Sequence, residues 1–129
     1  MIVRAITAAA MLAAIACGGS EAKPARDDDA LTAAWRAAKL EVSALTAVDG
    51  AAYGSKACRG GTVSSVDVVL CDYGSGEDAQ AAAELGLAVI GNATGSALAR
   101  GTRVLVVVDR RKADPSGRTI DAITSAFRK

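Results

Sequence analysis

The first clear pattern along the chain is a run of apolar residues at helical spacing. Steps of four, three, four and three positions separate its members, Leu31, Trp35, Ala38, Val42 and Leu45. Residues spaced in this way share one face of an α-helix and form a stripe that packs on a core. The pattern predicts a helix over Ala30–Val48, which ends at Asp49-Gly50 because glycine is favoured just after a helix.

Apolar and polar residues alternate over Val63–Tyr73, which predicts a strand. Its residues divide between two faces, with Val66, Val68 and Leu70 on one and Asp67, Val69 and Cys71 on the other. A short strand around Lys56–Cys58, with Gly60-Gly61 as turn residues, would complete a hairpin. In that hairpin a bond from Cys58 to Cys71 would join the two strands.

The second half of the chain predicts a helix, a strand and a helix. The first helix covers Glu77–Ala88, and Gly91–Gly95 is expected to be a loop or a helix interruption. The apolar run within Arg103–Asp109 predicts a strand buried on both faces. Asp114-Pro115 has the residue types of a helix N-cap and first helical position. The expected buried side chains of the two helices are Ala79, Ala82, Ala83 and Leu87, then Ile120, Ile123 and Phe127.

The order of elements is helix, hairpin, helix, strand, helix, which predicts a small α+β fold. We expect a two-layer sandwich in which helices pack on one face of about three strands. Residues 30–129 are of a length that forms one domain. Its core must be mainly aliphatic, because the 129 residues include only one Trp, two Tyr and one Phe.

The start of the chain has the pattern of an export signal. Arg4 supplies a positive charge, and an uncharged, mostly apolar stretch runs from Ala5 to Ala16. This stretch fits the range of about 7–15 residues seen in signal peptides. It is well short of the roughly 20 residues that a membrane-spanning helix needs. After Cys17 the sequence becomes polar and charged.

The segment Ala14-Ile15-Ala16-Cys17 resembles the lipobox of bacterial lipoproteins, although that family most often has Leu where this chain has Ala14. The resemblance implies cleavage before Cys17 and attachment of lipid to that cysteine. Residues 1–16 would then be a signal peptide, and residues 17–29 a flexible linker anchored by lipid to a membrane of the cell envelope. Gly18 favours the outer membrane, where the cell has one. An ordinary signal peptide, giving a secreted soluble protein, is the alternative.

Two cysteines remain if Cys17 carries lipid, and an even pair in an exported protein usually forms a disulfide. Cys58 and Cys71 are therefore expected to bond, which would stabilise the domain by about 3 kcal/mol. A redox or metal site built on the same thiols is the alternative. Because the chain has no His and no Cys-X-X-Cys, such a site would lack its usual partners. We expect no metal and no cofactor.

Positive and negative charges nearly balance, with a formal net charge of +1. This argues against nucleic-acid binding, which is typical of strongly basic domains. The C-terminal part is mildly basic, and one hypothesis is a binder of anionic lipid or cell-wall polymer. The side chains available for such contacts are Arg100, Arg103, Arg110, Arg111 and Lys112. A solvated surface is the alternative. Asp27-Asp28-Asp29 is likewise interpreted as linker and helix start instead of a cation site.

Patterns that would indicate catalysis are weak. Gly74-Ser75-Gly76 precedes a helix, but the full phosphate-loop motif is absent, and Glu77 and Asp78 would repel a phosphate. Without His, no serine has its usual activating base. Asp67 and Asp72 are interpreted as strand and turn residues. We therefore expect no catalytic residue, and a binding or scaffolding domain that contacts an envelope protein or an anionic polymer. A small envelope enzyme is the alternative.

Overall fold

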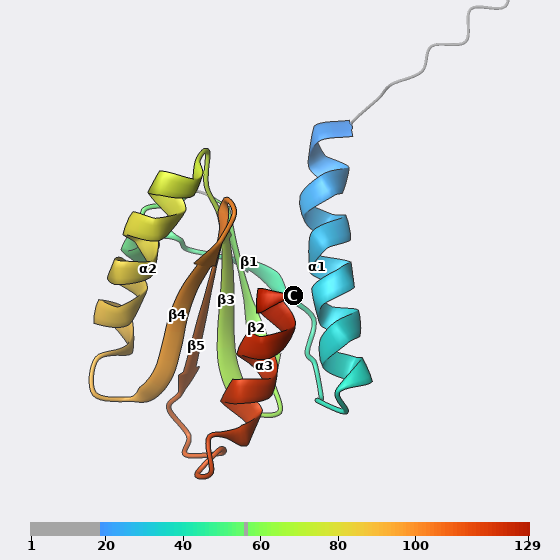
Figure 1. Ribbon diagram of the computed structural model, residues 1–129, viewed down its shortest axis with the longest axis vertical. Coiled ribbons are helices and arrows are strands. Elements are labelled where there is room, and N and C mark those ends of the chain that lie inside the picture. The colour runs from blue at the N-terminus through green and yellow to red at the C-terminus, as the bar shows by residue number, and fades with distance from the viewer. Residues whose placement is uncertain (1–18, 56) are drawn as a thin grey trace, which may run out of the picture.

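The computed structural model describes residues 19–55 and 57–129, with side chains from Asp28 onward. The predicted signal peptide, the lipobox-like segment and Cys17 lie outside the described residues, as does Lys56 of the predicted short strand. The described chain has an α+β fold (Figure 1). Its elements are α1 (Gly19–Ala37), β1 (Thr46–Val48), η1, a 3-10 turn (Ala51–Tyr53), β2 (Cys58–Val63), β3 (Val66–Asp72), α2 (Gly76–Ile90), β4 (Thr94–Arg100), β5 (Arg103–Asp109) and α3 (Arg118–Arg128).

The strands form one sheet in the order β1-β2-β3-β5-β4, with every neighbouring pair antiparallel. Helix α2 covers one face, and α1 and α3 cover the other (Figure 1). The α+β class is confirmed, but the prediction of about three strands with helices on one face is wrong. Because β5 is apolar on both faces, each face needs its own covering layer to exclude water.

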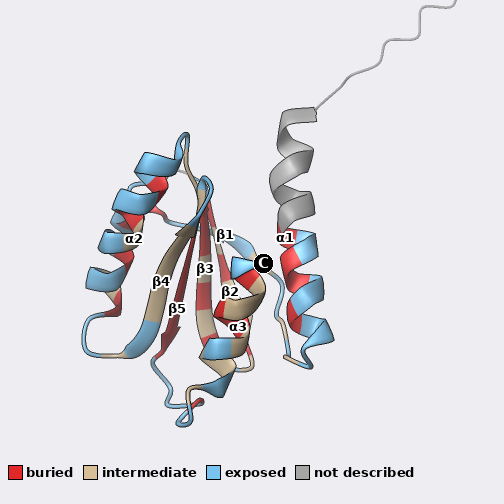
Figure 2. Ribbon diagram, viewed as in Figure 1, coloured by how far each residue is buried: buried red, intermediate tan, exposed pale blue. Residues whose placement is uncertain are grey.

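The sheet separates two apolar clusters, which Figure 2 shows as buried stretches on the strands and on the inner sides of the helices. The α1/α3 cluster contains Leu31, Trp35, Val63, Val66, Val68, Leu70, Leu105, Val107, Ile123 and Phe127. The α2 cluster contains Tyr53, Cys58, Cys71, Ala79, Ala82, Ile90, Val104, Val106 and Val108. The predicted alternation of β3 is confirmed, since Val68 and Cys71 fall in different clusters.

Helix α1 runs from Gly19 to Ala37, whereas the prediction was Ala30–Val48. Its end is a Schellman motif, in which Leu40 N–H donates to Trp35 O and Lys39 N–H donates to Arg36 O. Lys39 takes the left-handed conformation, with φ 66°. The predicted linker is therefore helical from Gly19 onward.

The apolar stripe predicted for a longer helix continues beyond Ala37 in extended chain. Val42 forms an isolated antiparallel bridge with Val63, and Val42 and Leu45 pack against the α1/α3 cluster. Steps of three and four residues cannot distinguish a helix from a helix followed by a short extended segment. That ambiguity caused the error in the predicted helix end.

The hairpin between β2 and β3 turns at Ser64-Ser65, with φ values of 48° and 69°. The glycines expected in the turn, Gly60 and Gly61, lie inside β2 instead. A Cβ on Gly61 would come within 2.6 Å of the Ser43 hydroxyl oxygen. Gly61 therefore lets the extended chain before β1 lie close to β2, and Gly60 leaves room for the side chain of Val48 in β1.

Strand β4 begins at Thr94, so it takes the last two residues of the loop expected over Gly91–Gly95 and the residues after them. Its sequence, Thr94-Gly95-Ser96-Ala97-Leu98-Ala99-Arg100, has few residues that favour strands. Pairing with β5 and packing under α2 hold it in place. A Cβ on Gly86 of α2 would lie 2.9 Å from both the Ala97 and the Val106 side chains. Gly86 thus contacts the sheet where Leu87 was expected to do so, and Leu87 is exposed.

Candidate functional site

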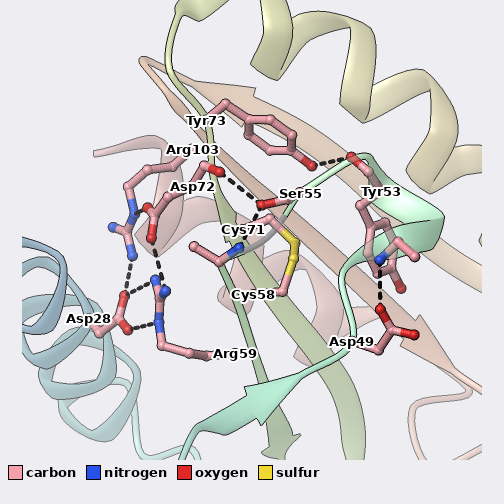
Figure 3. Close-up of a disulfide and its surroundings, with 12 residues drawn as sticks. Asp28, Asp49, Tyr53, Ser55, Cys58, Arg59, Cys71, Asp72, Tyr73 and Arg103 are labelled. Carbon is pink, nitrogen blue, oxygen red and sulfur yellow. Dashed lines mark hydrogen bonds and ion pairs between the residues drawn. A yellow bond between two sulfur atoms is a disulfide. The ribbon is translucent and has the colours of Figure 1, made fainter.

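Cys58 and Cys71 form a disulfide between β2 and β3, as predicted (Figure 3). They are directly opposite in the register, with Cα atoms 4.1 Å apart. Asp72 N–H donates to Ala57 O, so Ala57 and Asp72 are a hydrogen-bonded pair of the ladder. Hydrogen-bonded and non-hydrogen-bonded pairs alternate along an antiparallel ladder, so the next pair, Cys58 and Cys71, is non-hydrogen-bonded. Such pairs have the closest Cα atoms of an antiparallel ladder. The hairpin therefore brings the two cysteines together without the bond having to bend the strands.

The disulfide is covered by the chain that leads into η1. Cys58 is 3% exposed and Cys71 is fully buried. A Cβ on Gly50 would lie 2.6 Å from the Cys58 sulfur, so only glycine allows the chain to cover it this closely. A thiolate in solution must reach a sulfur atom to exchange with it. This cover therefore protects the bond from exchange.

Hydrogen bonds around η1 hold that cover on the sheet (Figure 3). The Tyr73 hydroxyl donates to Tyr53 O at 2.6 Å, and the Ser55 hydroxyl donates to Asp72 O at 2.9 Å. Burial raises the pKa of Tyr53, an effect that the positive charge of Arg110 partly offsets. Burial, and then the nearby Tyr53, raise the pKa of Tyr73. Both phenols stay protonated at neutral pH, so neither acts as a base, and the Tyr73 hydroxyl is a hydrogen-bond donor.

On the opposite face of the same strands, four charged side chains form one ion-pair network (Figure 3). Asp28 of α1 accepts hydrogen bonds from Arg59 of β2 and Arg103 of β5. Asp72 of β3 accepts from Arg59 Nη1 at 2.9 Å, and its other oxygen is 3.5 Å from Arg103 Nε. The network joins α1 to three neighbouring strands.

The network lies beside the disulfide because neighbouring residues of a strand face opposite ways. Arg59 follows Cys58, and Asp72 follows Cys71. Burial opposes the charged form of Arg59, but hydrogen bonds to Asp28 and Asp72 and their negative charges outweigh it, so its pKa is raised. One end of the hairpin is therefore held covalently on the α2 face and by ion pairs on the α1 face.

The five basic residues proposed as anionic-partner contacts lie at the two ends of β5. Arg103 belongs to the network, and Arg100 Nη1 donates to Phe127 O at 3.1 Å. At the other end, Arg110 donates to Val89 O, and Arg111 donates to Ser65 O and pairs with Asp67 at 2.9 Å. Lys112 is exposed beside them. The structure does not bring the five into one patch.

The segment Gly74-Ser75-Gly76 is a turn and a helix cap, as interpreted from the sequence. The Ser75 hydroxyl accepts a hydrogen bond from Asp78 N–H at 3.1 Å, and Glu77 and Asp78 lie in the first turn of α2. Their negative charges complement the positive end of the helix dipole. Within residues 28–55 and 57–129, no three acidic or cysteine side chains are grouped closely enough to hold a metal ion.

Sequence reasoning missed the network, although each member was visible. Asp28 was assigned to a linker, Asp72 to a turn, and Arg59 was not singled out. Their partners are 13 to 75 residues away in sequence, so no local spacing marks them. The signal that could have found them is a charged residue next to each cysteine of the predicted hairpin.

Comparisons with known proteins do not assign the chain to a family. No protein-family profile matches it, and neither a curated protein nor a solved structure does so. None of the helices in the described part of the chain is long and apolar enough to cross a membrane.

Proposed function

We propose that this protein is an exported lipoprotein of the cell envelope, anchored by lipid on Cys17, whose domain binds or scaffolds a partner without catalysis of its own. The Cys58–Cys71 disulfide carries the proposal. Stable disulfides form in compartments outside the reducing cytosol. The bond thus supports a location outside the cytosol, which is also what the export signal implies. This support does not depend on the first residues of the chain.

Burial of the disulfide supports a structural role for it in preference to a redox role. Redox-active disulfides expose a sulfur to the incoming thiolate. Cys58 is only 3% exposed, and Cys71 is not exposed. The domain would therefore keep this bond under conditions that reduce an exposed one.

The hydrogen bonds of the charged and phenolic groups near the disulfide support a non-catalytic domain. Arg59 and Arg103 are paired with Asp28 and Asp72. The pKa of Tyr53 is raised by burial, which disfavours the ionised form that a general base needs. The contacts of these groups stabilise the fold, which is the role expected in a binding or scaffolding domain.

Helix α1 begins two residues after the proposed anchor. Its 19 residues span about 28 Å at 1.5 Å per residue. In this proposal the domain is connected to the membrane through a helix that is fixed to the sheet by Asp28. A partner would then meet a domain of restricted orientation instead of one on a flexible linker.

Acyl labelling in a bacterial host tests the anchor. Cys17→Ala should abolish incorporation of a labelled fatty acid. The matched control is the double variant Cys58→Ala/Cys71→Ala, which also lacks cysteines but should be labelled like the wild type. Undiminished labelling of Cys17→Ala would contradict the proposal, and an unlabelled wild-type chain would indicate a secreted protein.

A further inference from the structure

Strand β4 forms a long edge of the sheet that is unpaired within the described part of the chain. It pairs with β5 along all seven residues, from Thr94↔Asp109 to Arg100↔Arg103, without a bulge. Helix α2 lies along one face of it (Figure 1), and α3 contacts it from the other. The edge itself lies between these helices.

The register identifies the backbone groups on this edge. Tyr73 N–H donates to Thr102 O at 2.8 Å, so even-numbered residues of β5 bond to β3 and odd-numbered ones bond to β4. The β4 residues that lie opposite the odd-numbered residues of β5 have their N–H and C=O groups turned toward β5. The alternate residues, Gly95, Ala97 and Ala99, have theirs turned outward.

Natural sheets protect their edges with short strands, proline, charged residues or bulges. The other edge, β1, is three residues long. In contrast, β4 contains no proline and no lysine, and its one charge is at its last residue, Arg100. The edge of β4 is therefore able to pair with another strand.

We propose that β4 pairs with β4 of a second copy of this chain, antiparallel and about a two-fold axis at Ala97. In this register Ala97 faces its own counterpart, and Gly95 faces Ala99 of the other copy. The three outward residues would complete the ladder in both copies. Arg100 would come opposite Thr94, so no like charges face each other across the axis.

The position of α2 favours a second copy as the occupant. Gly86 lies equally close to Ala97 of β4 and Val106 of β5, so α2 lies above the space between these strands. Strands are about 4.8 Å apart. The axis of α2 is half a strand spacing from β4 on one side, and the proposed two-fold axis is half a spacing from β4 on the other. The helix axis and the two-fold axis are therefore about one strand spacing apart. The two-fold then places the two α2 helices about 10 Å apart, a normal packing distance for helices.

An exposed leucine lies where those helices would meet. Leu87 follows Gly86, which is level with Ala97, and it is 49% exposed. A Cβ on Gly54, beside η1, would lie 3.8 Å from Leu85 Cδ1, so Leu85 is on the η1 side of α2. One residue turns the helix by about 100°, so Leu87 faces the opposite side, toward the β4 edge. The two copies would bury Leu87 against Leu87.

The test is the association of the full chain, measured by sedimentation equilibrium in density-matched detergent over a wide concentration range. We expect a reversible dimer. Ala97→Pro removes one outward N–H without touching the β4–β5 ladder, which is where sheets tolerate proline. Leu87→Glu places two carboxylates face to face. Each variant should weaken dimerisation by about tenfold or more, equivalent to about 1.4 kcal/mol.

Leu85→Glu is the matched control, because Leu85 is equally exposed but faces away from the proposed interface; it should dimerise like the wild type. If Ala97→Pro does not fold, the comparison of Leu87→Glu with Leu85→Glu decides the question alone. A wild type that stays monomeric throughout would overturn the proposal. So would a dimer that both interface variants leave unchanged. Neither outcome bears on the lipid anchor.

Discussion

Asp28 connects α1 to the sheet through arginines of two different strands. Its side chain is 11% exposed, and those of Arg59 and Arg103 are 21% and 17% exposed. Ion pairs this sheltered are less screened by water and salt than those on a free surface. Removal of one member leaves the opposite charges partly buried and unpaired, and this penalty exceeds the strength of the pair itself.

Asp28→Asn should destabilise the domain by about 2 kcal/mol, between the values typical of exposed and of fully buried ion pairs. Urea unfolding of the oxidised protein measures the loss. Asp29→Asn is the control, since Asp29 is the exposed neighbour on the same helix, and it should change stability little. Equal losses in the two variants would mean that Asp28 does not connect α1 to the sheet.

Cys58→Ala, Cys71→Ala and the double variant should each lose about 3 kcal/mol of unfolding free energy. The three losses should be similar because each variant removes the same bond, and both side chains are buried to a similar extent. Urea unfolding with and without reductant measures them, and reduced wild type should behave like the variants. Clearly unequal losses would argue against pairing.

The disulfide and the network differ in how far the sequence revealed them. The number of cysteines and the alternation of β3 were sufficient to predict the Cys58–Cys71 pair. Asp28 follows no periodic pattern, and its partners are brought near it only by the docking of α1 on the sheet. Contacts that depend on how helices pack on a sheet cannot be derived from local spacing.

At the scale of elements, two buried aspartates shape the loop between β5 and α3. Asp109 accepts hydrogen bonds from the N–H groups of Ala113 and Asp114, both at 2.9 Å. Asp114 in turn accepts from Thr119 N–H at 3.1 Å and Ile120 N–H at 2.8 Å. The prediction that Asp114 is the N-cap and Pro115 the first helical residue is wrong, because α3 begins at Arg118 with Gly117 as its N-cap. The Asp114 carboxylate nevertheless accepts hydrogen bonds from N–H groups in the first turn of α3.

Asp114 should make stability depend on pH. Burial opposes its charged form, but hydrogen bonds from Ile120 and Thr119 outweigh this, so its pKa is lowered. A carboxyl with a lowered pKa in the folded state stabilises the protein above its unfolded pKa of about 3.9, and that stability is lost as the pH falls through the folded pKa. Unfolding free energies should therefore fall as the pH drops below about 4.

Asp114→Asn is the variant that assigns this pH dependence. It should be less stable than the wild type at neutral pH, and the difference should shrink as the pH falls below about 4. Chemical unfolding followed by circular dichroism at several pH values measures it. A difference that stays constant over this range would show that the charge of Asp114 does not support the start of α3.

The elements differ in how well the sequence predicted them, for physical reasons. β5 was predicted correctly, and β3 was predicted correctly from Val66 onward, because an apolar run or an alternation records burial on the sheet. The start predicted at Val63 was wrong, since Val63 ends β2 and Ser64-Ser65 form the turn. β4 was missed because small residues such as Gly95 and Ala97 are held by their neighbours and not by their own preference. The end of α1 depends on a left-handed Lys39, a conformation that the residue type does not announce.

At the scale of the whole molecule, the sheet is covered on both faces, and each face has its own apolar cluster. The sequence contained the signal for this, because a strand buried on both faces, such as β5, requires two covering layers. The prediction of a single helical layer was inconsistent with this strand, because it left one of its two apolar faces uncovered. The order of strands depends on the β4–β5 hairpin, so it could not be derived once β4 was missed.

The most direct test of the proposed function is the intact mass of the mature protein from its native host, extracted in detergent without reductant and treated with a thiol-alkylating reagent. We expect a chain that lacks residues 1–16, carries acyl groups and gains no alkyl group, because lipid occupies Cys17 and a disulfide occupies Cys58 and Cys71. A mature chain without acyl groups, or one alkylated at Cys58 and Cys71, would contradict the proposal of an anchored, disulfide-stabilised envelope protein.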